Sequence, residues 1–363
     1  MNTIKSITRA DMADIALGGA FLGTGGGGDP YIGRLMAEQS IDEHGPVPVL
    51  DVDSLDDDAL VVPVCMMGAP TVMLEKLPRG DEAINALRSL EAVLGRKADA
   101  VFCIEAGGLN STIPIAVAAT TGLPIIDGDG MGRAFPELQM VSMTMFNVHA
   151  CPMAMADDKG NAFVLNTVDN LSTEKFARVI TVEMGGAGLI ALYPMTGAQA
   201  KKSILRGSLS LITSIGRIIS SEQAANRNPA NKLAADLNGM RLFEGRVTDV
   251  DRRTEGGFAR GQATIEGLEA YQGRSMKLHF QNEFLLAKDE KGRPLAITPD
   301  LICLLDLETG QPITTETMAY GYRVIVFGMP CDPKWRSKHG LELVGPAYFG
   351  YEEEYQPIEK INN

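Results

Sequence analysis

The densest set of chemically useful side chains in this sequence follows an apolar run. After Leu123–Ile126 come two carboxylates, a guanidinium and a third carboxylate, which are Asp127, Asp129, Arg133 and Glu137. Glycines alternate with them, and glycine permits positive φ or close backbone approach to a bound group. Open α/β sheets bind their ligands where buried strands end. We therefore predict an active site at this strand end.

The two aspartates have several chemical uses. Asp127 and Asp129 are two residues apart, so they share a face if the segment is extended. Paired carboxylates divide acid and base roles or hold a divalent metal, for which His149 is a further weak candidate. In the alternative interpretation they accept hydrogen bonds from loop N–H groups. Arg133 either binds a substrate carboxylate bidentately or pairs with Glu137, four residues on in an expected helix.

A second strand end has a similar layout. The apolar run 100–104 is followed by Glu105, two glycines and Asn110, before a helix expected from Ser111 to Gly122. Adjacent strand ends line one crevice in open sheets. We predict Glu105 as a catalytic residue and Asn110 as a substrate-binding residue. In the alternative, Glu105 caps a loop and Asn110 caps the helix.

A glycine-rich loop is the third signal. Residues 23–28 precede a helix that we expect to begin at Asp29-Pro30. Free N–H groups and the helix dipole there suit a carboxylate, a phosphate or an oxyanion. The loop lacks the lysine of a Walker motif and follows a helix rather than a strand, which disfavours a nucleotide site. The alternative is a tightly packed turn. The predicted substrate-binding residues are Thr24, Gly25, Gly26, Gly27 and Gly28.

The elements that must position these residues fall into two groups. Non-alternating apolar runs indicate buried strands of a parallel sheet at 60–67, 100–104 and 123–126. A hairpin is expected at 148–165, and helices at 7–22, 29–39, 81–94, 111–122, 172–184 and 196–222. From about Met240 short strands follow, at 242–250, 258–265, 275–280, 283–287, 301–305 and 322–327.

These patterns predict an α/β fold with two parts. The N-terminal domain, 1–168, is a layered and mostly parallel sheet, and the C-terminal region, 169–363, contains helices at 172–222. Its β-barrel-like all-β part covers 240–330, and an aromatic tail packs back on the body.

Composition limits the partners. The 363 residues carry a net charge of −13, which argues against nucleic acid or an anionic membrane. No apolar run approaches the roughly 18 residues of a membrane span. Five cysteines without CxxC spacing indicate a reduced, cytoplasmic protein. We expect a small-molecule substrate and a homo-oligomer. No cofactor is evident, although a divalent metal fits the carboxylates.

Four motifs together resemble the S-methyl thiohydantoin desulfurase family, whose genes often neighbour hydantoinase genes. They are Gly-Thr-Gly-Gly-Gly-Gly-Asp-Pro (23–30), Glu-Ala-Gly-Gly-Leu-Asn-Ser (105–111), Asp-Gly-Asp-Gly-Met-Gly-Arg-Ala-Phe-Pro-Glu-Leu-Gln-Met (127–140) and Gly-Pro-Ala-Tyr-Phe-Gly-Tyr (345–351). The resemblance covers nearly the whole chain. It implies an N-terminal α/β domain and a C-terminal region with a β-barrel-like part, and it leaves the substrate of this member open.

The resemblance and the residues together suggest a hydrolase of a small cyclic amide-like substrate, for which an S-alkyl thiohydantoin is our first hypothesis. Water adds to the ring carbon that bears sulfur, and a thiol leaves. In this hypothesis Asp127 or Asp129 is the base, Glu105 and Asn110 bind the ring, and the 24–28 loop stabilises negative charge. The alternatives are an accessory protein of a hydantoinase-type system and, more weakly, a phosphate- or nucleotide-binding enzyme. A single site requires the loop to lie near the aspartates.

Overall fold

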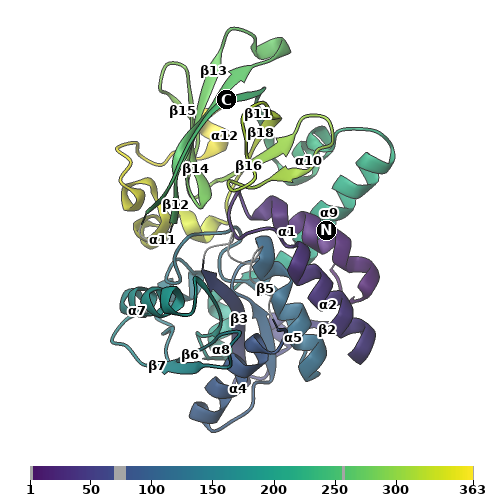
Figure 1. Ribbon diagram of the computed structural model, residues 1–363, viewed down its shortest axis with the longest axis vertical. Helices are drawn as coiled ribbons and strands as arrows, with labels where there is room; N and C mark the ends of the chain where they lie inside the picture. The colour runs from purple at the N-terminus through teal and green to yellow at the C-terminus, as the bar shows by residue number, and fades with distance from the viewer. Residues whose placement is uncertain (1–2, 69–78, 256–257, 363) are drawn as a thin grey trace.

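The computed structural model describes residues 3–68, 79–255 and 258–362. Its helices are α1 Met12–Leu22, α2 Tyr31–His44, α4 Glu82–Leu94, α5 Ile113–Thr121, α6 Ser142–Met145, α7 Asn170–Glu183, α8 Gly197–Ser203, α9 Ser208–Ala224, α10 Ala230–Leu237, α11 Lys338–Val344 and α12 Ile358–Ile361. An α/β body forms one half of the molecule and an all-β part the other (Figure 1).

The α/β body is built on a ten-stranded sheet. Its strands are β1 Ser6–Ile7, β2 Val47–Leu50, β3 Leu60–Gly68, β4 Ala100–Cys103, β5 Ile125–Asp129, β6 Met153–Ala156, β7 Ala162–Leu165, β8 Ala187–Ala191, β9 Met195–Thr196 and β10 Leu205–Arg206. The four central strands are parallel in the order β2-β5-β4-β3, and the outer strands add antiparallel. The expected parallel sheet is confirmed, and β4 and β5 end side by side.

The all-β part is an eight-stranded antiparallel sheet. Its strands are β11 Met240–Glu255, β12 Phe258–Gly267, β13 Ser275–Gln281, β14 Glu283–Asp289, β15 Pro294–Ile297, β16 Leu301–Asp306, β17 Pro312–Ile313 and β18 Arg323–Met329. The order runs from β15 through β11 to β17. The sheet curls, because β14 and β15 also contact β16. Among the described residues no ladder joins β15 to β17, so the part expected to be barrel-like is a curled sheet rather than a closed barrel.

Strands β16 and β18 join the two parts. Cys303 and Phe327 face the core of the α/β body, whereas their strand neighbours Leu304 and Val326 face the core of the second sheet. Both faces of these strands are therefore buried, which explains why their sequences are apolar without alternation. The two parts share a continuous apolar interface.

Close helix packing fixes one side of the body. At Gly18 of α1 a Cβ would stand 1.8 Å from the carbonyl oxygen of Ile212 in α9, and at Gly216 of α9 one would stand 1.8 Å from that of Asp14. Only glycine allows the two helices to approach this closely. Helix α1 leads directly into the glycine-rich loop, so this contact also anchors the loop.

Several predicted boundaries differ from the structure. The helix expected at 7–22 begins at Met12, and α2 begins one residue after Pro30 and runs to His44. The helix expected at 196–222 is wrong as one element. Thr196 does cap a helix, with Gln199 in a capping box, but this helix ends at Ser203. Strand β10 and Gly207, whose φ is 76°, then precede α9.

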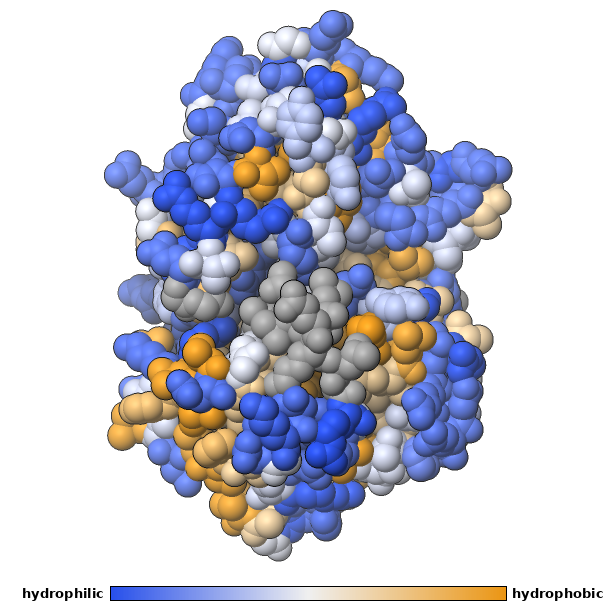
Figure 2. Space-filling model, in the orientation of Figure 1, coloured by the Kyte–Doolittle hydropathy of each residue, from blue (hydrophilic) through white to orange (hydrophobic). Residues whose placement is uncertain are grey.

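Exposed apolar side chains gather on the edge strand β7 and on helix α7. They are Phe163, Val164, Leu171, Phe176, Val179 and Val182. Apolar residues are visible over this part of the surface (Figure 2). The homo-oligomer expected from the sequence stays a prediction. Within the described ranges, no helix is long and apolar enough to cross a membrane.

Candidate active site

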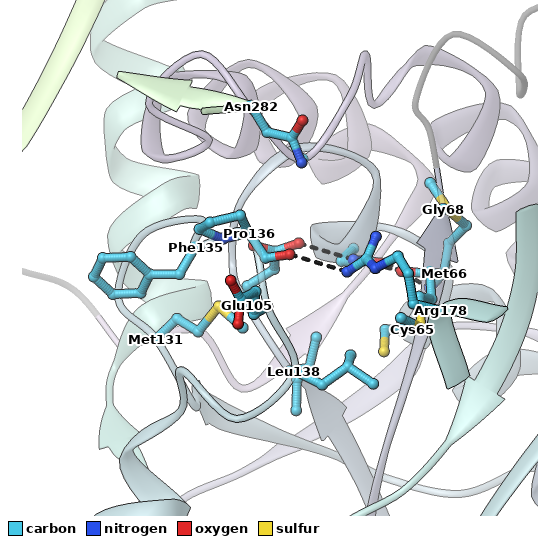
Figure 3. A pocket seen from close by; sticks show the side chains of 15 residues that line it. Cys65, Met66, Gly68, Glu105, Met131, Phe135, Pro136, Leu138, Arg178 and Asn282 are labelled. Atoms are coloured by element: carbon cyan, nitrogen blue, oxygen red, sulfur yellow. Dashed lines mark hydrogen bonds between the residues drawn. The ribbon is translucent and has the colours of Figure 1, made fainter. Parts of the chain in front are cut away.

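A cavity lies where the ends of β3, β4 and β5 meet helix α7 and the second sheet. It has about 540 Å³ of empty space, part of which is open to solvent. Its walls carry the polar residues Glu105, Asn110, Glu137, Arg178 and Asn282, together with Gly27 (Figure 3). The strand ends of the two sequence motifs therefore do line one crevice.

Glu105 is the central carboxyl of this cavity. It is buried, and one oxygen accepts a 2.8 Å hydrogen bond from Nδ2 of Asn110. Its other oxygen, Oε2, has no hydrogen-bond partner within 3.5 Å among the described residues, although the backbone N–H of Phe135 is near enough to the carboxyl to lower its pKa. Burial raises the pKa of Glu105 to about 8, and the nearby charge of Asp129 adds to this effect. A carboxyl with this pKa can exchange a proton near neutral pH.

Asn110 orients Glu105. Its Oδ1 accepts from the backbone N–H of Met66 at 2.7 Å, and its Nδ2 donates to the carbonyl of Met66 and to Glu105. The side chain thus ties the end of β3 to the segment after β4. The expected helix cap is instead Thr112, because a 3₁₀ turn at Gly108–Ser111 precedes α5.

Asp127 and Asp129 share a face, as the sequence predicts, but that face meets helix α9. Asp127 accepts from the backbone N–H and the hydroxyl of Ser210. Asp129 accepts from the hydroxyl of Ser208 at 2.6 Å and from the N–H groups of Ala106 and Gly132, both at 2.8 Å. Neither aspartate lines the cavity. Burial raises the pKa of Asp129 to about 6, while these hydrogen bonds oppose the rise.

Arg133 lies outside the cavity and is fully buried. Its guanidinium donates to the hydroxyl of Thr24 and the carbonyl of Phe284, both at 2.9 Å, and to the carbonyl of Asp300 at 2.8 Å. Residues 130–140 form bends and a short turn rather than a helix, so the helix expected to pair Arg133 with Glu137 is absent there. Arg133 connects the glycine-rich loop to the second sheet.

The glycine-rich loop passes between the two parts of the molecule. The carbonyls of Thr24, Gly25 and Gly27 accept hydrogen bonds from the N–H groups of Phe284, Thr315 and Leu109 respectively. A Cβ on Gly25 would clash with the ring of Phe284 at 2.5 Å. The loop is tightly packed, as in the alternative interpretation, and within it Gly27 reaches the cavity. Gly28, with a φ of 75°, leads into α2.

Glu137 lines the cavity and is held by the C-terminal tail. Its Oε2 accepts from the hydroxyl of Tyr348 at 2.8 Å and from the amide of Gln139. Tyr348 belongs to the aromatic motif at 345–351. This motif therefore holds one residue of the cavity wall in place.

Two cavity residues come from distant elements that the sequence did not single out. Arg178 of α7 is paired with Glu174 at 2.6 Å. It also donates to the carbonyl of Pro136 at 3.2 Å (Figure 3). Asn282 has a φ of 56° at the turn between β13 and β14, and its Oδ1 accepts from the N–H of Ala259. A positive φ favours asparagine over most residues. An asparagine between two expected strands is therefore the signal in the sequence that could have indicated this turn.

Sulfur-bearing side chains form an apolar wall. Cys65, Met66, Met67 and Met131 line the cavity. Burial raises the pKa of the Cys65 thiol well above its usual range, so this thiol is neutral. The wall is apolar and polarizable, which suits a thioether group.

The described residues contain no group of three or more His, Cys, Asp or Glu side chains placed to hold a metal ion. His149, the weak candidate, lines a separate cavity together with His339 and Asn170. Metal binding by Asp127 and Asp129 stays a prediction, although their oxygens accept the hydrogen bonds described above.

Comparison with known proteins places the chain in a family. The S-Me-THD-like N-terminal domain matches residues 10–167, and the S-Me-THD-like C-terminal domain matches residues 168–358. A crystal structure of a protein from Chromobacterium violaceum, solved by a structural genomics consortium, is similar over 98% of this chain and 100% of its own, with a TM-score of 0.81 and 25% identity. No curated protein matches. The chain belongs to the S-Me-THD-like family, which confirms the resemblance in the sequence.

Proposed function

We propose that this member of the S-Me-THD-like family hydrolyses an S-methyl thiohydantoin, releasing methanethiol and leaving a hydantoin. The observation that carries the proposal is Glu105. It is a buried carboxyl at the cavity wall, with one oxygen oriented by Asn110 and the other without a partner among the described residues. A general base needs an oxygen that is free to accept a proton, a fixed position and a pKa near the working pH.

In the proposed reaction the Glu105 carboxylate takes a proton from water while the water oxygen bonds to the ring carbon that carries sulfur. The carbon–sulfur bond then breaks, and Glu105 returns that proton to the departing methanethiolate. The ring carbon now carries a hydroxyl group. The proton of this hydroxyl moves to the adjacent ring nitrogen, and the oxygen becomes the hydantoin carbonyl. Glu105 therefore replaces Asp127 and Asp129 as the proposed base, since both aspartates accept hydrogen bonds from the first turn of α9.

The other walls support a ring of this kind. The sulfur-bearing wall suits the methylthio group, and the neighbouring polar groups of Asn282 and Glu137 suit ring N–H and carbonyl groups. Arg178 lines the cavity, so we propose it in place of Arg133 as the partner of a substrate carboxylate. Its pairing with Glu174 fixes its direction.

The test is a free-thiol release assay with S-methyl thiohydantoins, with the hydantoin product identified by mass spectrometry. We expect release by the wild type and a loss of about 10²-fold or more in Glu105→Gln. Glu43→Gln, at an exposed position on α2, is the matched control and should retain full activity. No release by well-folded wild type would overturn the proposal and favour the accessory-protein alternative.

A further inference from the structure

Helix α7 presents an apolar face to solvent. On its outer side lie Leu171, Phe176, Val179 and Val182, which are between 43% and 63% exposed. The opposite side of the helix packs on β3 and β8. The solvent side of a surface helix is ordinarily polar, and an exposed apolar patch marks an interaction surface. The outer face of α7 is therefore suited to contact with another protein surface.

The charges on this outer face are balanced and evenly placed. Lys175 lies four residues before Val179, and Glu183 lies four residues after it. Both side chains are exposed. The whole chain carries a net charge of −13, so two copies repel each other over most of their surface. On the outer face of α7 one positive and one negative charge offset each other, so a second copy can approach there.

The order of residues along α7 makes this face complementary to itself. If two copies of the helix pack antiparallel with Val179 at the centre, Lys175 of one copy lies at the same height as Glu183 of the second copy. Phe176 of one copy then lies at the height of Val182 of the second. A two-fold contact is reciprocal, so both ion pairs form together. A different protein would need neither the reciprocal charges nor their equal spacing from Val179.

The exposed apolar surface continues from α7 onto the edge of the sheet. Segment 166–169 joins β7 to α7 and carries Val168, which is 85% exposed, and Phe163 and Val164 of β7 are exposed as well. Strand β7 ends the ten-stranded sheet, and among the described strands it pairs with β6 alone. Charged residues often protect such edges, but β7 has none. A stable interface covers about 800 Å² on each partner, and this extension beyond α7 helps to supply that area.

We propose that a second copy of this chain docks on the outer face of α7, antiparallel and centred on Val179, to form a two-fold homodimer. Apolar side chains of the two helices meet along the contact, and a Lys175–Glu183 ion pair closes it at each end. Arg178 of the same helix lines the cavity. The contact therefore braces one wall of the candidate site from outside.

The first experiment is sedimentation equilibrium of the full chain over a range of concentrations. We expect the wild type to have twice the mass of one chain. Val179→Glu should be monomeric where the wild type is dimeric, because it places two like charges against each other at the two-fold axis. Leu35→Glu is the matched control, since Leu35 is an exposed apolar residue of α2, on the opposite side of the body (Figure 1). This variant should remain a dimer.

Charge reversal tests the antiparallel arrangement. Lys175→Glu or Glu183→Lys alone brings like charges together and should raise the Kd of the dimer about tenfold or more. The double variant Lys175→Glu/Glu183→Lys restores opposite charges and should recover the wild-type Kd. A monomeric wild type would leave this face to a different protein and overturn the proposal. A dimer that survives Val179→Glu, or a double variant no tighter than the single ones, would also overturn it.

Discussion

Buried carboxyls lie on both sides of the sheet where β4 and β5 end, and their hydrogen bonding differs between the two sides. On the side that faces α9, the oxygens of Asp127 and Asp129 accept hydrogen bonds from Ser208, Ser210 and nearby backbone N–H groups. On the side that faces the cavity, Glu105 has one oxygen bonded and one without a partner among the described residues. Burial alone therefore does not separate the carboxyls hydrogen-bonded to α9 from the one that we propose as the base.

Saturation of the acceptor oxygens is what separates them. A carboxylate whose two oxygens both accept from fixed donors holds those donors in place and has less capacity left for a substrate. A buried carboxyl with a free oxygen at a cavity can bind or exchange a proton there. The comparison predicts structural effects for one side and chemical effects for the other.

Arg133 gives the largest expected effect and tests whether a saturated buried charge is structural. We predict that Arg133→Met lowers the free energy of unfolding by about 3–5 kcal/mol, because the substitution leaves Thr24, Phe284 and Asp300 without their donor. Urea unfolding measures this. Arg253→Met, where the side chain is exposed, should change stability by less than about 0.5 kcal/mol. A loss below about 1 kcal/mol for Arg133→Met would break the comparison.

The pH dependence of stability tests the raised pKa of Glu105, the carboxyl on the cavity side. The pKa of Glu105 is about 8 in the folded protein, above its usual 4.5, so the folded state binds more protons between these values. The free energy of unfolding must therefore fall as pH rises through this interval. We predict that Glu105→Gln removes this part of the fall, on the order of a few kcal/mol. Urea unfolding at pH 5 and at pH 8 measures this change in the free energy of unfolding. An equal change between the two pH values for the wild type and Glu105→Gln would contradict the prediction.

The glycine contact between the motif after β4 and the glycine-rich loop gives a smaller effect. Gly108 has a φ of 54°, and a Cβ there would stand 2.2 Å from the carbonyl oxygen of Gly27. We predict that Gly108→Ala costs at least about 1 kcal/mol more than Gly122→Ala, where φ is also positive but nothing lies within 4 Å. Thermal unfolding of both variants isolates the clash from the φ strain. Equal losses would show that the loop can move away from residue 108.

Local patterns in the sequence predicted much of the fold and part of the site. The buried strands, the second all-β part and the crevice between the motifs at 105 and 127 follow from short-range periodicity and glycine placement. The side of the sheet to which Asp127 points could not be predicted, because it depends on a helix that begins at Ser208. Arg178 and Asn282 reach the site through tertiary packing, for which one sequence carries little pattern.

The most direct test compares the two kinds of carboxyl in one assay. Thiol release from an S-methyl thiohydantoin is measured per folded molecule for Glu105→Gln and Asp127→Asn. The account predicts a loss of about 10²-fold or more for Glu105→Gln. For Asp127→Asn it predicts activity close to wild type with reduced stability. Loss of activity in folded Asp127→Asn, with activity retained in Glu105→Gln, would contradict it and return the catalytic role to the aspartates.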